Sequence, residues 1–448
     1  CRMMEGRCQT GQNSRSLSNS HSKGSCPMSR FSICVAVVVS VLSSNFSNRS
    51  SADELWPLEK LSSPPPMKWL DDSSPIRSLT YENEEFKGQT TDVFAFYATP
   101  GTISGDLSKD KNLPAVVLIH GGGGTAFAQW TWLWAKRGYA AIAMDLSGRR
   151  PPAPRFDPAT GELINEFSRP VDRPRLERGG PEHGHVEKFA NVGDDPTDDW
   201  QHHSVPAVIR AHSLIRSFKE VDAERTAVTG ISWGGYMTCL VASVDHRFKA
   251  AVPVYGCGFL YDGESVQRPA IDQLSPEKRT LWIETYDPSA WLPRCRVPIF
   301  FVNGTNDIHY PLVSYSRSYG LVKGPKQIRI EVKMRHGHQP GWEPNEIGRF
   351  IDHHLLDTDP LPQLGTPQFK DGVATVGVET PLELKQAQLH YTTDSGRLAE
   401  RNWTSLPASI DGKTISATVP DSATIWLLSA TDSRDAMVST DVVFVSQE

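Results

Sequence analysis

The chain has 448 residues, of which 38% are hydrophobic and 9% aromatic, so it can bury a sizeable core and is longer than one ordinary domain. We expect one large domain and one smaller domain. The formal net charge is −6, the pI is about 6.2, and the sequence contains no long run of Lys or Arg. A surface that follows the phosphates of nucleic acid is therefore not expected.

The first 52 residues are predicted to precede the folded protein. Residues 1–27 show no apolar periodicity, and Met28 is the more natural start. Arg30 then supplies a positive charge, residues 31–41 form an apolar stretch, and residues 50–52 form a small-residue cleavage site. The apolar stretch is shorter than the roughly 20 residues that span a bilayer. We expect a secretory signal that is cleaved near Asp53, a secreted or periplasmic product and no membrane span after cleavage; an uncleaved anchor is the alternative.

The cysteine content is compatible with export. Four of the seven cysteines fall in the predicted leader, and the mature chain keeps Cys239, Cys257 and Cys295. An odd number leaves room for at most one disulfide. We therefore expect no disulfide framework and interpret these residues as small buried side chains.

Short apolar runs alternate with stretches of helical spacing over some 250 residues. The runs predicted as buried strands cover residues 93–97, 115–120, 140–146, 226–232, 250–255, 298–303 and 328–334. Helical spacing occurs at residues 126–137, 204–218, 233–243 and 345–355. This alternation predicts an α/β fold with a mostly parallel central sheet and helices on both faces, and ligands then bind at the carboxyl ends of the strands.

Two segments depart from this alternation. Residues 148–200 are rich in Pro, Gly and charged residues and are interpreted as an insertion beside the site, with a lid as one role. After a catalytic domain at residues 53–357 comes a Pro-rich hinge, and residues 366–448 then show period-two patterns with turn signals at Asp371-Gly372 and Asp411-Gly412. We expect a small all-β sandwich there.

The strongest chemical signal is the sequence GISWGG at residues 230–235. It matches G-x-S-x-G and lies where a predicted strand hands over to a predicted helix. Such a turn needs glycines on either side because neighbouring backbones approach closely, and it lifts the serine hydroxyl clear of the sheet. We interpret Ser232 as a nucleophile; a purely structural turn is the alternative.

A second signal is His120 followed by four glycines, at the end of a predicted strand. Unhindered backbone N–H groups at this place suit an oxyanion hole, with Gly122 as the first donor and the amide of Trp233 as the second. A tight turn alone would also explain the glycines. Neither a Walker lysine nor the spacing of a dinucleotide fingerprint follows, so no cofactor is expected.

Two further signals follow later strands. Asp307 lies in NGTND at residues 303–307, and HGH at residues 336–338 follows the last predicted strand, which gives the chain order Ser, Asp, His. Asp307 would orient a histidine base, and either His336 or His338 is suitably placed. The other histidine pairs lack the spacing of zinc sites, so no metal is expected.

The stretches HGGGGTAFAQW, GISWGGYMT, VNGTNDIHYPL and MRHGHQPGW, within residues 120–342, resemble the α/β-hydrolase families around dienelactone hydrolases, prolyl-oligopeptidase catalytic domains and bacterial acetyl xylan esterases. The resemblance implies a Ser232–histidine–Asp307 triad. It favours His338 as the base, because the resembled families have a Gly-His pair there and Gly337 precedes His338, and it makes His336 the alternative. Dienelactone hydrolases carry cysteine in place of Ser232, and the propeller of prolyl oligopeptidases is missing, so both departures favour an esterase.

The resulting hypothesis is a secreted serine carboxylic-ester hydrolase that deacetylates carbohydrate, with a small-molecule or polysaccharide ester as substrate. A peptidase or amidase on the same triad and another ester or lactone hydrolase are the alternatives. A non-catalytic binding module is disfavoured because Ser232, Asp307 and a suitable histidine are all present.

Overall fold

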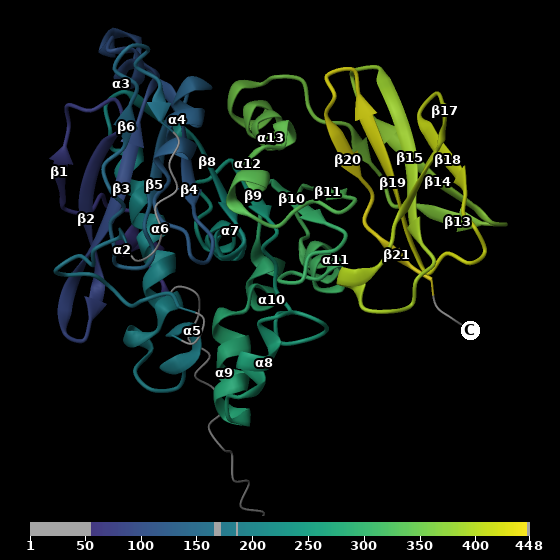
Figure 1. The fold of residues 1–448 in the computed structure, drawn as a ribbon, viewed down its shortest axis with the longest axis horizontal. Helices are drawn as coiled ribbons and strands as arrows, with labels where there is room; N and C mark the ends of the chain where they lie inside the picture. Colours follow the sequence, from purple (N-terminus) through teal and green to yellow (C-terminus); the bar gives the residue numbers. More distant parts are fainter. Residues whose placement is uncertain (1–54, 165–171, 185–186, 446–448) are drawn as a thin grey trace, which may run out of the picture. The chain divides into compact units, whose positions relative to one another are not determined.

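The structure is a computed structural model that describes residues 55–164, 172–184 and 187–445; the predicted leader lies outside these residues. Nine strands form the central sheet (Figure 1). In their order across the sheet they are β1 (Met67–Asp71), β2 (Arg77–Phe86), β3 (Gln89–Ala98), β5 (Ala140–Met144), β4 (Leu113–Ile119), β8 (Val221–Ile231), β9 (Ala250–Val254), β10 (Ile299–Gly304) and β11 (Lys326–Glu331).

The strands from β5 to β11 pair in parallel, whereas β1, β2 and β3 pair antiparallel at one side. The chain moves from β4 to β5 in one direction and then crosses back to β8, β9, β10 and β11 in the other. Strand order therefore reverses between β4 and β8. In open α/β sheets the loops at such a switch point diverge and leave room for a ligand.

Helices cover both faces of this sheet. Helix α4 (Ala128–Lys136) and helix α13 (Asn345–Leu356) share one face, where Tyr139 Oη, just after α4, donates to Asp352 Oδ1 at 2.7 Å. Helices α6 (Trp200–Arg216) and α7 (Trp233–Val244) pack together. Right-handed crossovers place them on the opposite face of the sheet. The other helices are α2 (Leu58–Leu61), α3 (Pro100–Ser104), α5 (Glu187–Ala190), α8 (Arg268–Asp272), α9 (Pro276–Tyr286), α10 (Pro288–Trp291), α11 (Leu312–Leu321) and α12 (His338–Trp342), with 3₁₀ turns η1 (Leu107–Lys109), η3 (Pro196–Asp198), η4 (Leu292–Arg294) and η5 (Leu398–Glu400).

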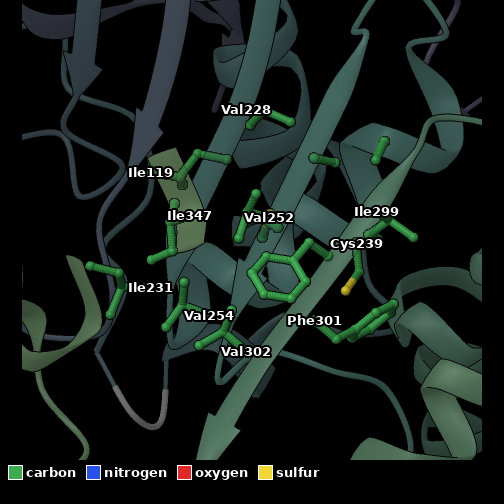
Figure 2. Close-up of a cluster of buried hydrophobic side chains, with 14 of the residues drawn as sticks. Ile119, Val228, Ile231, Cys239, Val252, Val254, Ile299, Phe301, Val302 and Ile347 are labelled. Atoms are coloured by element: carbon green, nitrogen blue, oxygen red, sulfur yellow. The ribbon is translucent and has the colours of Figure 1, made fainter. Parts of the chain in front are cut away.

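The core lies between the parallel strands and these helices. Figure 2 shows Val254 of β9 beside Val302 of β10, with which it pairs, and Cys239 of α7 and Ile347 of α13 contribute from the helices. Strands β4, β5, β9 and β10 are buried along their whole length, because both faces of a parallel sheet are covered. Within the described ranges, no helix is both long and apolar enough to cross a membrane.

The C-terminal region is built from two antiparallel sheets, as the period-two patterns predict. One contains β12 (Gln363–Leu364), β13 (Gln368–Lys370), β14 (Val373–Glu379), β17 (Ser409–Asp411) and β18 (Thr414–Thr418); the other contains β15 (Leu384–Thr392), β16 (Thr404–Pro407), β19 (Ile425–Asp432), β20 (Met437–Ser439) and β21 (Val443–Phe444). Asp371 and Gly372 both have positive φ, 51° and 76°, as a type I′ hairpin turn between β13 and β14 requires.

Each predicted strand and helix overlaps an element of the structure, with ends that differ by a few residues. β1 and β2 have no counterpart in the sequence prediction. In β2 the buried positions alternate at Leu79, Tyr81 and Asn83, and polar residues between them mask the apolar face. The insertion contributes a two-stranded hairpin, β6 (Arg155–Phe156) and β7 (Leu163–Ile164), before α5.

We expect Phe301→Ala to lower the free energy of unfolding by about 3–5 kcal/mol, because it leaves a cavity in a closely packed core. The Phe301 ring is fully buried and meets Tyr315 edge-on at 5.6 Å between ring centroids. Urea unfolding monitored by circular dichroism measures the change. Phe444→Ala removes a ring that is 40% exposed and should stay within about 0.5 kcal/mol. Equal losses in both variants would contradict the proposed location of the core.

A buried carboxyl precedes helix α6. Asp199 is 4% exposed, and its Oδ2 accepts a hydrogen bond from Tyr286 Oη at 2.7 Å. Burial raises the pKa of Asp199 from 3.8 to about 6. The neutral acid therefore stabilises the fold below pH 3.8, and this contribution is lost as the pH rises through about 6.

Asp199→Asn replaces the carboxyl by an amide that stays neutral and whose oxygen still accepts from Tyr286. We expect the stability of this variant relative to the wild type to increase by about 1–2 kcal/mol between pH 4.5 and pH 8. Urea unfolding at both pH values tests this. A difference between the two proteins that is the same at pH 4.5 and pH 8 would refute the raised pKa.

Candidate active site

Ser232 lies between strand β8 and helix α7 with φ 60° and ψ −116°, a conformation that side-chain-bearing residues rarely adopt. Its N–H donates to Val254 O at 2.8 Å. A Cβ on Gly230 would lie 2.1 Å from Gly234 O, and one on Gly234 would lie 2.0 Å from Ile119 O. Positions 230 and 234 must therefore both be glycine. The residue is 9% exposed and presents its hydroxyl at the carboxyl end of β8.

A hydrogen-bonded chain links Ser232 to two residues from later loops. Ser232 Oγ lies 3.0 Å from His336 Nε2, and His336 Nδ1 lies 2.6 Å from Asp307 Oδ2. In the neutral tautomer, Nδ1–H donates to the carboxylate and Nε2 accepts from the hydroxyl. The Asp307 side chain is fully buried, whereas that of His336 is 22% exposed. The hydrogen-bonded series is therefore buried at its Asp307 end and accessible to solvent at His336.

The loops around this chain hold it in place. Asp307 Oδ1 accepts hydrogen bonds from the backbone N–H groups of His309 and Tyr310 at 2.7 and 2.9 Å. The His336 ring is stacked against Tyr255, with ring centroids 4.4 Å apart. Tyr255 Oη donates to Arg335 O at 2.6 Å and so fixes the backbone just before His336. These contacts leave the imidazole little freedom to rotate.

The preference for His338 as the partner of Ser232 and Asp307 is wrong: His336 occupies that position. His338 begins helix α12, and its Nε2 accepts a hydrogen bond from Gly121 N–H at 3.0 Å. Its ring lies against Phe127, with centroids 4.6 Å apart. Burial lowers the pKa of His338 to about 3, so the ring stays neutral at ordinary pH.

The glycine loop after β4 lies directly against Ser232. A Cβ on Gly121 would lie 3.0 Å from Ser232 Cβ, and one on Gly122 would lie 3.1 Å from Trp233 Cδ1. Gly122, Ser232 and Trp233 line the same cavity. The N–H of Trp233 is the first of helix α7 and has no intrahelical acceptor. The two residues whose amides are expected to bind an oxyanion therefore line the cavity beside Ser232.

The cavity beside Ser232 has a volume of about 810 Å³, within the usual range for small-molecule sites. The insertion supplies much of its wall, with cationic groups at Arg149, Arg173 and Lys188. Arg173 Nη1 donates to the carbonyls of Gly123 and Gly124 at 2.9 and 2.6 Å. The insertion therefore shapes the cavity and also contacts the glycine loop.

Sequence reasoning missed the residues that support the site. Tyr255 was detectable in principle, because it is the last residue of the strand predicted at residues 250–255, at the same sheet edge as Ser232. Arg173 and Lys188 lie in an insertion with no periodic pattern, so no sequence signal marks them. No group of three or more His, Cys, Asp or Glu side chains among the described residues is arranged to hold a metal ion.

Residues 78–268 match the family model of acetyl xylan esterase (AXE1). Over 261 residues the chain is 25% identical to the acetyl esterase Axe7A of Xylanibacter ruminicola. The aligned stretch covers 54% of this chain and 55% of that protein. The chain thus spans about half the length of this curated relative.

A solved structure of an acetyl xylan esterase resembles the chain over a longer stretch. The enzyme from Thermoanaerobacterium sp. JW/SL YS485 is 17% identical, with a TM-score of 0.50, over 69% of this chain and 93% of that one. The enzyme from Paenibacillus sp. R4 is 22% identical, with a TM-score of 0.49, over 69% and 96%. The chain therefore has the α/β-hydrolase fold, and its residues 78–268 resemble the acetyl xylan esterase family.

Proposed function

We propose that the chain is a serine esterase that removes acetyl groups from carbohydrate esters. The observation that carries the proposal is the hydrogen-bonded chain from Ser232 through His336 to Asp307, which opens into a cavity of about 810 Å³. A serine hydroxyl becomes nucleophilic when an oriented histidine takes its proton. The match to acetyl xylan esterases and to an acetyl esterase supports acetyl as the acyl group.

In this proposal the reaction has two halves. Ser232 Oγ attacks the ester carbonyl while His336 Nε2 takes its proton, and Asp307 stabilises the imidazolium through the Nδ1–H bond of 2.6 Å. His336 then gives the proton to the departing sugar oxygen, which leaves acetyl on Ser232. Water attacks the acetyl-enzyme with the same base, releasing acetate and restoring the serine.

The developing oxyanion would be held by the backbone N–H groups of Gly122 and Trp233. Both residues line the cavity beside Ser232. Such donors act in the transition state more than in the ground state, and losing one typically costs 10²–10³-fold in kcat. The Trp233 amide also begins a helix, where the dipole favours negative charge.

We expect the purified protein to release acetate from acetylated xylan and acetylated xylose, and Ser232→Ala and His336→Ala each to lower kcat by at least about 10⁴-fold. Acetate assay against acetylated sugars, long-chain esters and peptide anilides measures this. The Ser232→Ala protein is the control for spontaneous hydrolysis. Efficient cleavage of peptide amides or long-chain esters, with acetylated sugars no better than the control, would replace deacetylation by one of the alternative hydrolase activities.

We also propose that the protein is exported, because a positive residue, an apolar stretch and small residues succeed one another between Met28 and Ala52. Cys239, Cys257 and Cys295 are buried and unpaired, so these thiols are shielded from an oxidising medium. Amino-terminal sequencing of protein secreted by expressing cells should give a start near Asp53. A secreted protein that retains residues 31–41 would contradict cleavage at this site.

A further inference from the structure

His338 connects two parts of the candidate site that lie far apart in the sequence. Its Nε2 accepts the Gly121 N–H at 3.0 Å, across 217 residues of chain. An acceptor nitrogen carries no proton, so the ring must be the neutral tautomer with hydrogen on Nδ1. The low pKa of His338, about 3, agrees with this tautomer at the pH at which esterases are assayed.

The next peptide unit along the loop is held from its other side. Gly121 O accepts from His120 Nδ1 at 2.7 Å and from Gly124 N–H at 3.0 Å. His120 is itself fixed, because its Nε2 accepts from Leu146 N–H at 2.9 Å. Side chains thus hold the peptide units on both sides of the Gly121 Cα.

These bonds determine where the Gly122 N–H points. A trans peptide is planar, and its C=O and N–H groups point in opposite directions. Because the Gly121 carbonyl is bound to His120 and Gly124, the Gly122 N–H of the same peptide points the other way. Gly122 lines the cavity that contains Ser232, so its N–H belongs to a residue that a bound acyl carbonyl can approach.

The glycines are needed so that the histidine rings can reach the loop. A Cβ on Gly124 would lie 2.7 Å from His338 Nε2 and 2.9 Å from His120 Nδ1. A Cβ on Gly121 would lie 3.1 Å from His338 Nε2. Both distances to His338 are tighter than an ordinary side-chain contact. The glycine run therefore leaves room for the two imidazoles.

We propose that His338 is a positioning residue that aligns the oxyanion loop with the base. This proposal rests on the proposed esterase function. His336 and His338 are separated by one residue, so a single segment places the base on Ser232 and holds the Gly121 N–H. The same short piece of backbone then fixes the position of the base relative to the oxyanion loop.

The test compares side chains of different reach at position 338. His338→Gln keeps an acceptor oxygen at about the distance of Nε2, whereas His338→Asn places its oxygen near Nδ1, too short to reach Gly121. We expect His338→Ala and His338→Asn to lower kcat on p-nitrophenyl acetate by roughly 10- to 100-fold with KM little changed, and His338→Gln to recover most of the loss. The affinity for a boronic acid that forms a tetrahedral adduct with Ser232 should fall in parallel with kcat.

His390→Ala is the matched control. His390 is another buried histidine whose ring nitrogens are hydrogen-bonded, to Ser405 Oγ at 2.7 Å and Ser429 Oγ at 2.8 Å, and its pKa is also lowered by burial. It lies on β15 in the C-terminal region. We expect it to lose stability in urea unfolding while kcat stays unchanged. If the role of His338 were purely structural, His338→Ala would likewise lose stability while kcat stayed unchanged.

The outcomes separate this proposal from the esterase function. Normal kcat in folded His338→Ala, a change confined to KM, or equal loss in the Gln and Asn variants would each overturn the positioning role. If the wild type hydrolyses no acetate ester, the proposed function fails, and the rate at which a fluorophosphonate labels Ser232 replaces kcat as the measurement. Slower labelling in the Asn variant than in the Gln variant would then support the positioning role; equal rates would refute it.

Discussion

The backbone of Ser232 is held in a conformation that costs about 1–3 kcal/mol, and the rest of the site is arranged around it. The strain persists because Gly230 and Gly234 let neighbouring backbones approach closer than any side chain would allow. The turn then does two things at once: it lifts the hydroxyl out of the sheet, and it starts helix α7 with the Trp233 N–H beside that hydroxyl. The proposed nucleophile and one proposed oxyanion donor therefore follow from one local constraint.

Sheet topology brings the other parts to this turn. The loops after β4, β8, β10 and β11 leave the same edge of a parallel sheet, and the strand order reverses between β4 and β8. Gly121, Ser232, Asp307 and His336 are thereby gathered although they are far apart in the chain. Each lies within a few residues of a strand end, so the rigidity of the sheet limits how far they can drift from one another.

Hydrogen-bond pattern alone does not define such a site. His212 has the same kinds of partner as His336, with Asp245 Oδ2 at 2.8 Å from Nδ1 and Thr226 Oγ1 at 2.8 Å from Nε2. It is fully buried and stacked on Phe248 at 3.7 Å, so no substrate can reach the threonine. Burial lowers the pKa of His212 to about 4, and the imidazolium that a general base must form is disfavoured there. Access to a cavity, rather than the set of partners, distinguishes the two histidines.

The sequence predicted the features that depend on local residue patterns and not those that depend on contacts between distant segments. Strand ends carry residue-type signals, and the α/β architecture, the sheet edge and the Ser232 turn follow from them. Which of two histidines faces Ser232 depends instead on the path of a short loop. Strand β11 ends at Glu331, three residues before the predicted end at Met334, and Lys333 turns with φ 56°. After this turn His336 is the ring that contacts Ser232 and Asp307, whereas the Gly-His pair favours His338. The local sequence could not reveal this, because the contacts that select between the two rings, Asp307 on one and Gly121 on the other, come from distant strands.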